Sequence, residues 1–75
     1  MYFSYSEVLK IKKLLDEKFG VYLHFHDACG GQYFSFDSTP DKNVIDYLSK
    51  YFSELGGRLN TSDNGLTFSV QKKQP

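Results

Sequence analysis

Apolar residues recur at spacings of three and four over residues 5–19, which places them on one face of a helix. The members of this stripe are Val8, Ile11, Leu15 and Phe19. Ser4 and Glu7 have the spacing of a capping box, in which each side chain accepts a hydrogen bond from the other residue's backbone amide. Gly20 follows as a left-handed stop. The pattern therefore predicts a capped helix over residues 5–19.

From residue 21 the hydrophobic period changes to two, which is typical of a strand with one buried face. The apolar phase holds Val21, Leu23 and Phe25 and, after a break, Phe34 and Phe36. The opposite phase holds Tyr22, His24 and His26 and, after the same break, Tyr33 and Ser35. We interpret the break as a four-residue turn at residues 28–31, which pairs Phe25 with Phe34 and His26 with Tyr33. Both phases then agree in register across a hairpin.

A second helix is predicted from Pro40 to about Leu55. Thr39 is a suitable N-cap, Pro40 is favoured at the first helical position, and Asp41 suits the positive end of the helix dipole. The apolar stripe of this helix is Val44, Ile45, Leu48, Tyr51, Phe52 and Leu55. Two glycines at residues 56–57 then end the helix.

The second helix is followed by a second hairpin. Asn64 and Gly65 form the strongest short signal for a two-residue type I′ turn, in which both residues have positive φ. The resulting cross-strand pairs are Leu59 with Val70 and Thr61 with Phe68. The opposite phase is polar throughout and consists of Arg58, Asn60, Ser62, Thr67, Ser69 and Gln71.

Two helix–hairpin units, residues 4–37 and 38–71, together predict one α+β domain of order αββαββ. We expect a two-layer sandwich with both helices on one face of a four-stranded antiparallel sheet. Strand order 1-2-4-3 is preferred and resembles a circularly permuted ferredoxin-like fold, with 2-1-3-4 as the alternative. Residues 72–75 lack periodicity and are predicted as a flexible tail. The sheet positions predicted to face the helices are Val21, Leu23, Phe25, Phe34, Phe36, Leu59, Phe68 and Val70.

Composition agrees with one small domain and excludes several classes. The chain has 75 residues, 40% of them hydrophobic, and nine basic side chains balance nine acidic ones. This length has room for one core, and a neutral chain lacks the positive field that attracts nucleic acid. One cysteine permits no intrachain disulfide, the start has no basic leader, and no apolar run reaches the ~18 residues of a membrane span. We therefore expect a cytoplasmic protein with no membrane, nucleic-acid or cofactor association.

Two histidines and the single cysteine are the residues best suited to chemistry. His24 and His26 share one face of the first strand about 7 Å apart, and Cys29 follows in the turn. Zinc prefers imidazole and thiolate ligands, so these three residues are the candidate metal ligands, and Cys29 is also a candidate nucleophile. The spacing matches none of the usual zinc motifs. Two surface histidines beside a structural turn cysteine are the competing interpretation.

The polar phase of the first hairpin gives the main functional hypothesis. Tyr22, His24, His26 and Tyr33 are expected to form one accessible patch on the sheet face away from both helices. Tyrosine and histidine present apolar area with a polar tip, which suits protein contacts. We therefore predict a non-enzymatic binding or self-association module that acts through this face, with a solvated amphipathic face and the thiol or metal site as alternatives. Histidine gains a proton near pH ~6.5 in model peptides, so mildly acidic pH would affect such a contact.

The sequence His-Asp-Ala-Cys-Gly-Gly at residues 26–31, followed by Tyr-Phe-Ser-Phe at 33–36, resembles the RDAC family of small bacterial proteins, named for an Arg-Asp-Ala-Cys motif. Asp27, Ala28 and Cys29 match the motif, and His26 stands in place of its arginine. The resemblance covers one hairpin and the overall length, and it implies no established activity. Because a guanidinium does not normally coordinate zinc, an arginine at this position argues against a metal-ligand role for His26.

Overall fold

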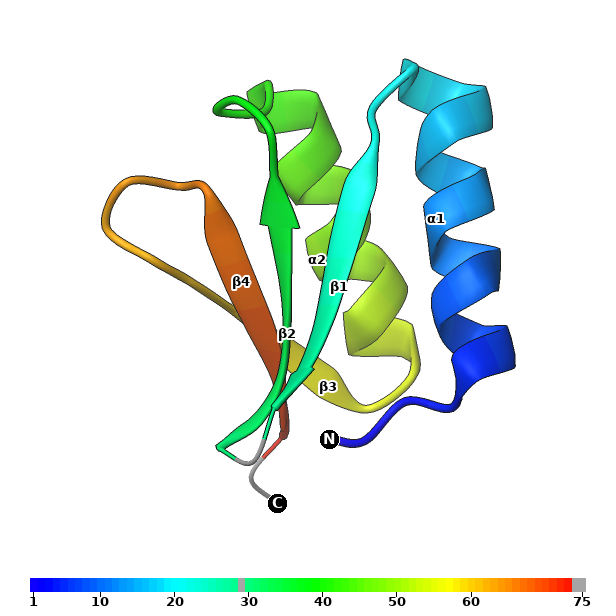
Figure 1. Ribbon diagram of the computed structural model, residues 1–75, viewed down its shortest axis with the longest axis vertical. Helices are drawn as coiled ribbons and strands as arrows, with labels where there is room; N and C mark the ends of the chain where they lie inside the picture. Colours follow the sequence, from blue (N-terminus) through cyan, green and yellow to red (C-terminus); the bar gives the residue numbers. More distant parts are fainter. Residues whose placement is uncertain (29, 74–75) are drawn as a thin grey trace.

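The computed structural model describes residues 1–28 and 30–73 and has the α+β architecture that the sequence predicts. Its elements in chain order are α1 (Tyr5–Phe19), β1 (Leu23–Ala28), β2 (Gly31–Phe36), α2 (Lys42–Glu54), β3 (Gly57–Thr61) and β4 (Thr67–Lys72). The strands form one antiparallel sheet in the order β1-β2-β4-β3, and both helices lie on one face of it (Figure 1). The preferred strand order is confirmed, and β1 and β3 are the two edges.

The register of both hairpins is the one predicted from the alternation of side chains. The observed pairs include Phe25 with Phe34, His26 with Tyr33, Leu59 with Val70 and Thr61 with Phe68. The two units are joined between β2 and β4, where Phe34 pairs with Phe68 and Ser35 with Thr67. β4 runs to Lys72, so the strand extends one residue into the segment predicted as a tail.

One apolar core lies between the sheet and the helices. Its buried members are Phe3, Val8, Ile11, Leu15, Leu23, Phe34, Phe36, Val44, Leu48, Phe52, Phe68 and Val70. Every sheet position predicted to face the helices belongs to this core or packs against it, with Val21, Phe25 and Leu59 half-buried. None of the described polar or charged side chains is buried. Apolar and aromatic packing therefore stabilises the domain without buried polar networks.

Phe3 enters the core although it lies outside every periodic pattern. Its backbone is held by Gln32 on β2: the Gln32 side chain accepts a hydrogen bond from the Phe3 amide at 2.7 Å and donates one to the Phe3 carbonyl at 3.0 Å. The Phe3 ring meets that of Phe34 edge-on, with centroids 5.9 Å apart. The Gln32 side chain thus bonds to the Phe3 backbone as a neighbouring strand would, and this holds the Phe3 ring in the core.

The two helices begin differently. In α1 the predicted capping box is present: the Glu7 amide donates to Ser4 Oγ at 3.3 Å and the Ser4 amide donates to Glu7 Oε1 at 2.8 Å. These hydrogen bonds from Ser4 lower the pKa of Glu7 from its ordinary value. The N-cap of α2 is Asp41, so the predicted N-cap at Thr39 and first helical position at Pro40 are wrong. Thr39 and Asp41 are both preferred N-cap types, and the amides of Val44 and Ile45 donate to the Asp41 carbonyl.

The turn between β1 and β2 is shorter than predicted. Ala28 pairs with Gly31, so both residues belong to the ladder and not to the turn. Gly31 has a φ of 126°, a backbone conformation that residues with a side chain rarely adopt. Cys29, the predicted turn thiol, lies outside the described residues.

The turn between β3 and β4 is longer than predicted. Gly65 has the expected positive φ of 72°, but Asn64 does not, so the type I′ prediction is wrong. The Asn64 side chain accepts hydrogen bonds from the Ser62 hydroxyl at 2.8 Å and the Leu66 amide at 3.0 Å. The Ser62 amide then bonds to the Thr67 carbonyl at 2.9 Å. These side-chain bonds stabilise a wider turn that an Asn-Gly pair alone does not indicate.

Candidate binding face

The sheet face away from the helices, termed the open face, carries most of the predicted patch. Leu23 and Phe34 are buried on the helix side, so the alternate residues His24, His26 and Tyr33 point to the other side. Tyr33 is 39% exposed and both histidines are half-buried. Three of the four predicted residues thus share one accessible surface.

Tyr22 lies one residue before β1, at the border of the open face. It is 57% exposed, and its ring meets the His24 ring edge-on with centroids 4.7 Å apart. On its other side, Nζ of Lys12 on α1 lies 5.0 Å from the ring centroid, which is a cation–π distance. Tyr22 therefore connects the open face with the exposed side of α1.

The ring of His26 is held by two residues of β2. It stacks on Tyr33, with centroids 4.5 Å apart and planes inclined by 13°. Its Nε2 atom lies 2.9 Å from Oγ of Ser35, in hydrogen-bond contact. Both partners are on β2, so cross-strand pairing fixes the orientation of this imidazole.

His24 is held by a residue that the sequence patterns did not single out. Its Nε2 donates to Oδ1 of Asp37 at 2.7 Å, and the carboxylate side chain is 73% exposed. Leu23 pairs with Phe36, so extending this register by one residue places Asp37 beside the start of β1. That extension is the signal from which the contact could have been predicted.

The contact between Ser35 and His26 has the distance of a nucleophile and its base. Catalysis by such a pair also needs a group that orients the imidazole and donors for the developing charge. Asp37, the one described carboxylate that hydrogen-bonds to an imidazole, bonds to His24 and not to His26. The pair therefore organises the surface and lacks the orienting acid of a triad.

The two histidines among the predicted metal ligands make other contacts. The Nε2 atoms of His24 and His26 bond to Asp37 and Ser35. Within residues 1–28 and 30–73, no group of three His, Cys, Asp or Glu side chains could hold one ion. Cys29, the third predicted ligand, lies outside these residues. The described geometry of the two histidines thus gives no support to the metal alternative.

The half of the open face formed by β3 and β4 is polar. Its outward residues include Asn60, Thr67 and Ser69, and Arg58 is exposed near the start of β3. A shallow hollow of about 220 Å³ lies on this half, with Tyr33 at its border. Most of its lining residues carry a hydroxyl or amide group, so the open face passes from aromatic on one side to polar on the other.

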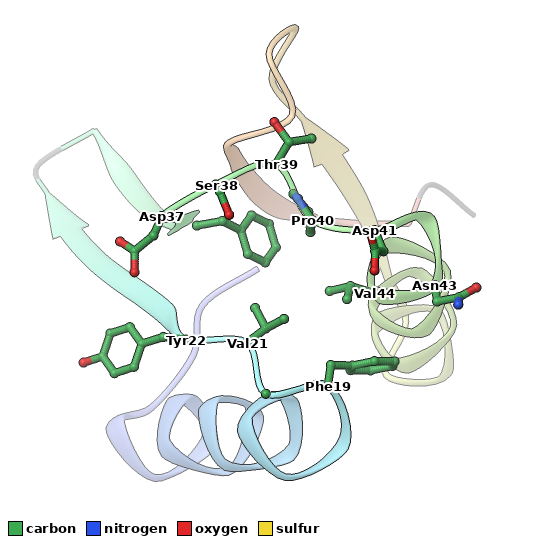
Figure 2. Close-up of a pocket in the computed structure, with 12 residues that line it drawn as sticks. Phe19, Val21, Tyr22, Asp37, Ser38, Thr39, Pro40, Asp41, Asn43 and Val44 are labelled. Carbon is green, nitrogen blue, oxygen red and sulfur yellow. The ribbon is translucent and has the colours of Figure 1, made fainter.

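A separate cleft of about 460 Å³ lies between the end of α1 and the start of α2 (Figure 2). This volume is within the ~300–1,000 Å³ of small-molecule pockets. Phe19, Val21 and Val44 form apolar walls, and Ser38 and Asp41 place oxygen atoms at the rim. The cleft is built from connections and helix ends of both units. Periodicity could not predict it, because no single element contains it.

Comparison of the chain with protein-family models, with curated proteins and with solved structures gives no match. Neither helix of the described chain has the length and apolar character needed to cross a membrane. The case for a function therefore depends on the surfaces of the domain itself.

Proposed function

We propose that the domain is a non-enzymatic protein-binding module that associates with a second copy of itself through the open face. Aromatic rings with polar tips are enriched in protein interfaces, and this face presents Tyr22 and Tyr33 with two imidazoles. The chain has zero formal charge, so no long-range repulsion opposes the approach of a second copy.

The placement of two charged residues carries this proposal. Asp37 follows the end of β2, and Arg58 lies near the start of β3. Since β2 and β3 both pair antiparallel with β4, they run parallel to each other, and the two residues lie at opposite ends of the sheet. Arg58 is on one edge strand, and Asp37 bonds to His24 on the other. The two charges therefore occupy diagonal corners of the open face.

Diagonal opposite charges make the face complementary to itself. A second copy related by a twofold axis in the plane of the face places each Asp37 against the Arg58 of the other copy. Two ion pairs then form in one isologous interface.

The size of the face sets the expected strength. Four strands about 4.8 Å apart and about 20 Å long cover roughly 400 Å². A standard interface buries about 800 Å² per partner, so this contact belongs to the small, transient class. Association at micromolar to millimolar concentrations is the expected range.

Sedimentation equilibrium of charge variants tests the pairing. Asp37→Arg and Arg58→Asp should each shift the chain toward monomer, because each places like charges together at both corners. The double variant Asp37→Arg/Arg58→Asp restores opposite charges and should recover most of the association. Recovery in the double variant distinguishes a direct pair from general loss of charge.

Matched controls separate the open face from other surfaces. Asp46→Arg changes an exposed carboxylate on α2, and Tyr5→Ser removes an aromatic ring of α1 that is 77% exposed. Both should leave the association constant unchanged, whereas Tyr33→Ser should lower it. Equal association in all variants, or a monomer at millimolar concentration, would contradict the proposal.

A thiol- or metal-dependent site around His24, His26 and Cys29 is the second candidate and is separated from the first by one measurement. Stoichiometric zinc in the purified protein would favour it.

Membership in the RDAC family and a cytoplasmic location are further parts of the proposal. They are supported by the motif at residues 26–31 and by the single cysteine.

A further inference from the structure

The stack of Tyr33 on His26 leaves the second face of the tyrosine ring directed along the sheet. His26 and Tyr33 are cross-strand partners on β1 and β2. Their ring centroids are 4.5 Å apart, and the ring planes are inclined by 13°. This separation is close to the ~4.8 Å between paired strands, so the two rings stand side by side across the sheet and face each other. The other face of the Tyr33 ring is therefore directed toward β4.

The residues beyond that face form a polar row across the sheet. Phe34 pairs with Phe68, so extending this register by one residue places Tyr33 beside Ser69 on β4. Ser69 in turn pairs with Asn60 on β3. The hollow of about 220 Å³ on the polar half of the open face includes all three residues of this row. An aromatic ring thus borders the hollow on the β2 side, an amide side chain borders it on the β3 side, and a hydroxyl lies between them.

The polar side chains of the hollow have unused hydrogen-bonding groups. Among the residues that the structure describes, no hydrogen bond joins the side chain of Asn60, Thr67 or Ser69 to another residue, whereas the Ser62 hydroxyl donates to Asn64. An amide side chain has two donors and two acceptor lone pairs, and a hydroxyl has one donor and two acceptor lone pairs. A ligand with several hydroxyl groups can replace the water at such groups with matching hydrogen bonds.

The lining of the hollow is uncharged, which selects for a neutral ligand. Besides Tyr33 and Phe68, its described lining residues all carry a hydroxyl or amide group, and they are Asn60, Thr61, Ser62, Thr67 and Ser69. Arg58, the outward cation of β3, is not among them. A charged ligand such as a phosphate ester would lose hydration without gaining a counter-charge. The volume is below the ~300–1,000 Å³ of drug-sized pockets, so the hollow suits a single small ring.

We propose that this hollow binds one ring of a neutral saccharide. The C–H groups on one face of a pyranose ring pack against the free face of Tyr33, and its hydroxyls bond to Asn60, Thr67 and Ser69. A purely apolar ring would leave these polar side chains without partners. The site lies on the face proposed for self-association but does not depend on that function. A bound sugar and a second copy exclude each other, because both would cover Tyr33.

NMR titration of the dilute full chain tests the site. The probes are the methyl β-glycosides of galactose and glucose and the methyl α-glycoside of mannose, with uridine as a flat control that can stack without a polyol. At least one glycoside should give saturable amide shifts at Asn60, Thr67 and Ser69, with a millimolar dissociation constant because a shallow hollow covers one side of a small ligand. Nuclear Overhauser effects should join the Tyr33 ring to sugar ring protons. Absence of saturable shifts with all three glycosides, or tighter binding of uridine, would overturn the proposal.

Matched variants separate the ring and the amide from the rest of the surface. Tyr33→Ser and Asn60→Ala should each weaken sugar binding by at least about fivefold, whereas Tyr33→Phe keeps the ring and should bind as the wild-type chain does. Asn43→Ala removes an exposed amide of α2 and should have no effect. Equal affinity in all four variants would overturn the site.

The same titration distinguishes this site from self-association. Asp37→Arg, which should be monomeric, leaves the hollow intact and should still bind the sugar. Sugar binding by a chain that never self-associates would support this site and contradict the proposed function. A chain that self-associates but gives no sugar shifts in its monomeric Asp37→Arg variant would contradict this site alone.

Discussion

The two helix–hairpin units have the same order of elements but different outward surfaces. The first unit, residues 4–37, presents Tyr22, His24, His26 and Tyr33. The second unit, residues 38–71, presents hydroxyls, amides and Arg58. Inward-facing residues are apolar in both. The difference teaches that one shared core supports two hairpins, of which the first presents the aromatic residues of the open face and the second presents a polar surface.

The units depend on each other through that core, and the strongest test removes a ring at their junction. Phe34 is on β2, yet its ring stacks on Phe68 of β4, with centroids 4.9 Å apart and planes inclined by 12°. Phe34→Ala should cost roughly 3 to 5 kcal/mol, from lost burial and the cavity left behind. Urea unfolding followed by circular dichroism measures the change. Tyr33→Ala, one residue away on the open face, should change stability by less than about 1 kcal/mol.

If the two substitutions cost the same, the face assignment of the first hairpin is wrong. Separate transitions for the two units in the Phe34→Ala variant would show that the core is not shared. A single transition at lower urea concentration is the expected result, since small domains unfold cooperatively.

Alternation was sufficient to predict the register because a slip of one residue would expose every apolar sheet position. The preferred strand order depended instead on a right-handed crossover and on the polarity of the third strand, which suits an edge. The turn geometry and the first residue of α2 were harder to predict from the sequence. Residues such as Asn64 and Asp41 can make several local hydrogen bonds of similar energy, and the sequence does not show which one forms. Phe3 was missed because its place depends on Gln32, a contact between distant segments. The patch residues were predicted from the alternation of side chains, but the cleft between the two helix ends is formed by several elements and leaves no periodic signal.

The glycines that end the helices differ between the units, and the second unit should be more sensitive there. Gly56 has the left-handed φ of 84°, while Gly57 is needed for space. A Cβ on Gly57 would lie 2.7 Å from Cγ1 of Val70 and 3.3 Å from the Phe52 carbonyl oxygen. Gly57→Ala should therefore cost about 1 to 3 kcal/mol through overpacking.

The control for this substitution is Gly30→Ala. A Cβ there meets no described atom within 4 Å, so thermal unfolding should change little. Equal melting temperatures for Gly57→Ala and the wild-type chain would mean that Val70 moves aside without loss.

The second hairpin depends on one left-handed glycine. Gly65 has a φ of 72°, and its added Cβ would meet Thr39 only at an ordinary 3.6 Å. Gly65→Ala should cost about 1 to 2 kcal/mol from backbone strain alone. Gly65→Asn should cost less, because asparagine tolerates this conformation better. An alanine variant as stable as the asparagine variant would show that the turn relaxes away from positive φ.

The smallest expected effect compares the two helix starts. Ser4 accepts the Glu7 amide, whereas the Asp41 side chain makes no cap hydrogen bond. Ser4→Ala should cost about 1 kcal/mol, and Asp41→Ala should cost clearly less, although both replace a preferred N-cap residue. Urea unfolding at neutral pH measures both variants. Equal costs would mean that Asp41 caps α2 in solution.

The pH dependence of stability that Glu7 confers is a second test of the difference between the two helix starts. Hydrogen bonds from the backbone and side chain of Ser4 lower the pKa of Glu7 below its ordinary 4.5 in the folded chain. A carboxyl with a lowered folded pKa stabilises the fold fully above its unfolded pKa, and this stabilisation is lost as pH falls through the folded value. Glu7→Gln removes the titration and keeps an acceptor at the same position. The stability difference between the wild-type chain and this variant should therefore be constant from neutral pH down to about pH 5.5 and shrink as the pH falls below 4.5. A difference that stays constant through the acid range would show that the capping box does not bind the ionised carboxylate more tightly.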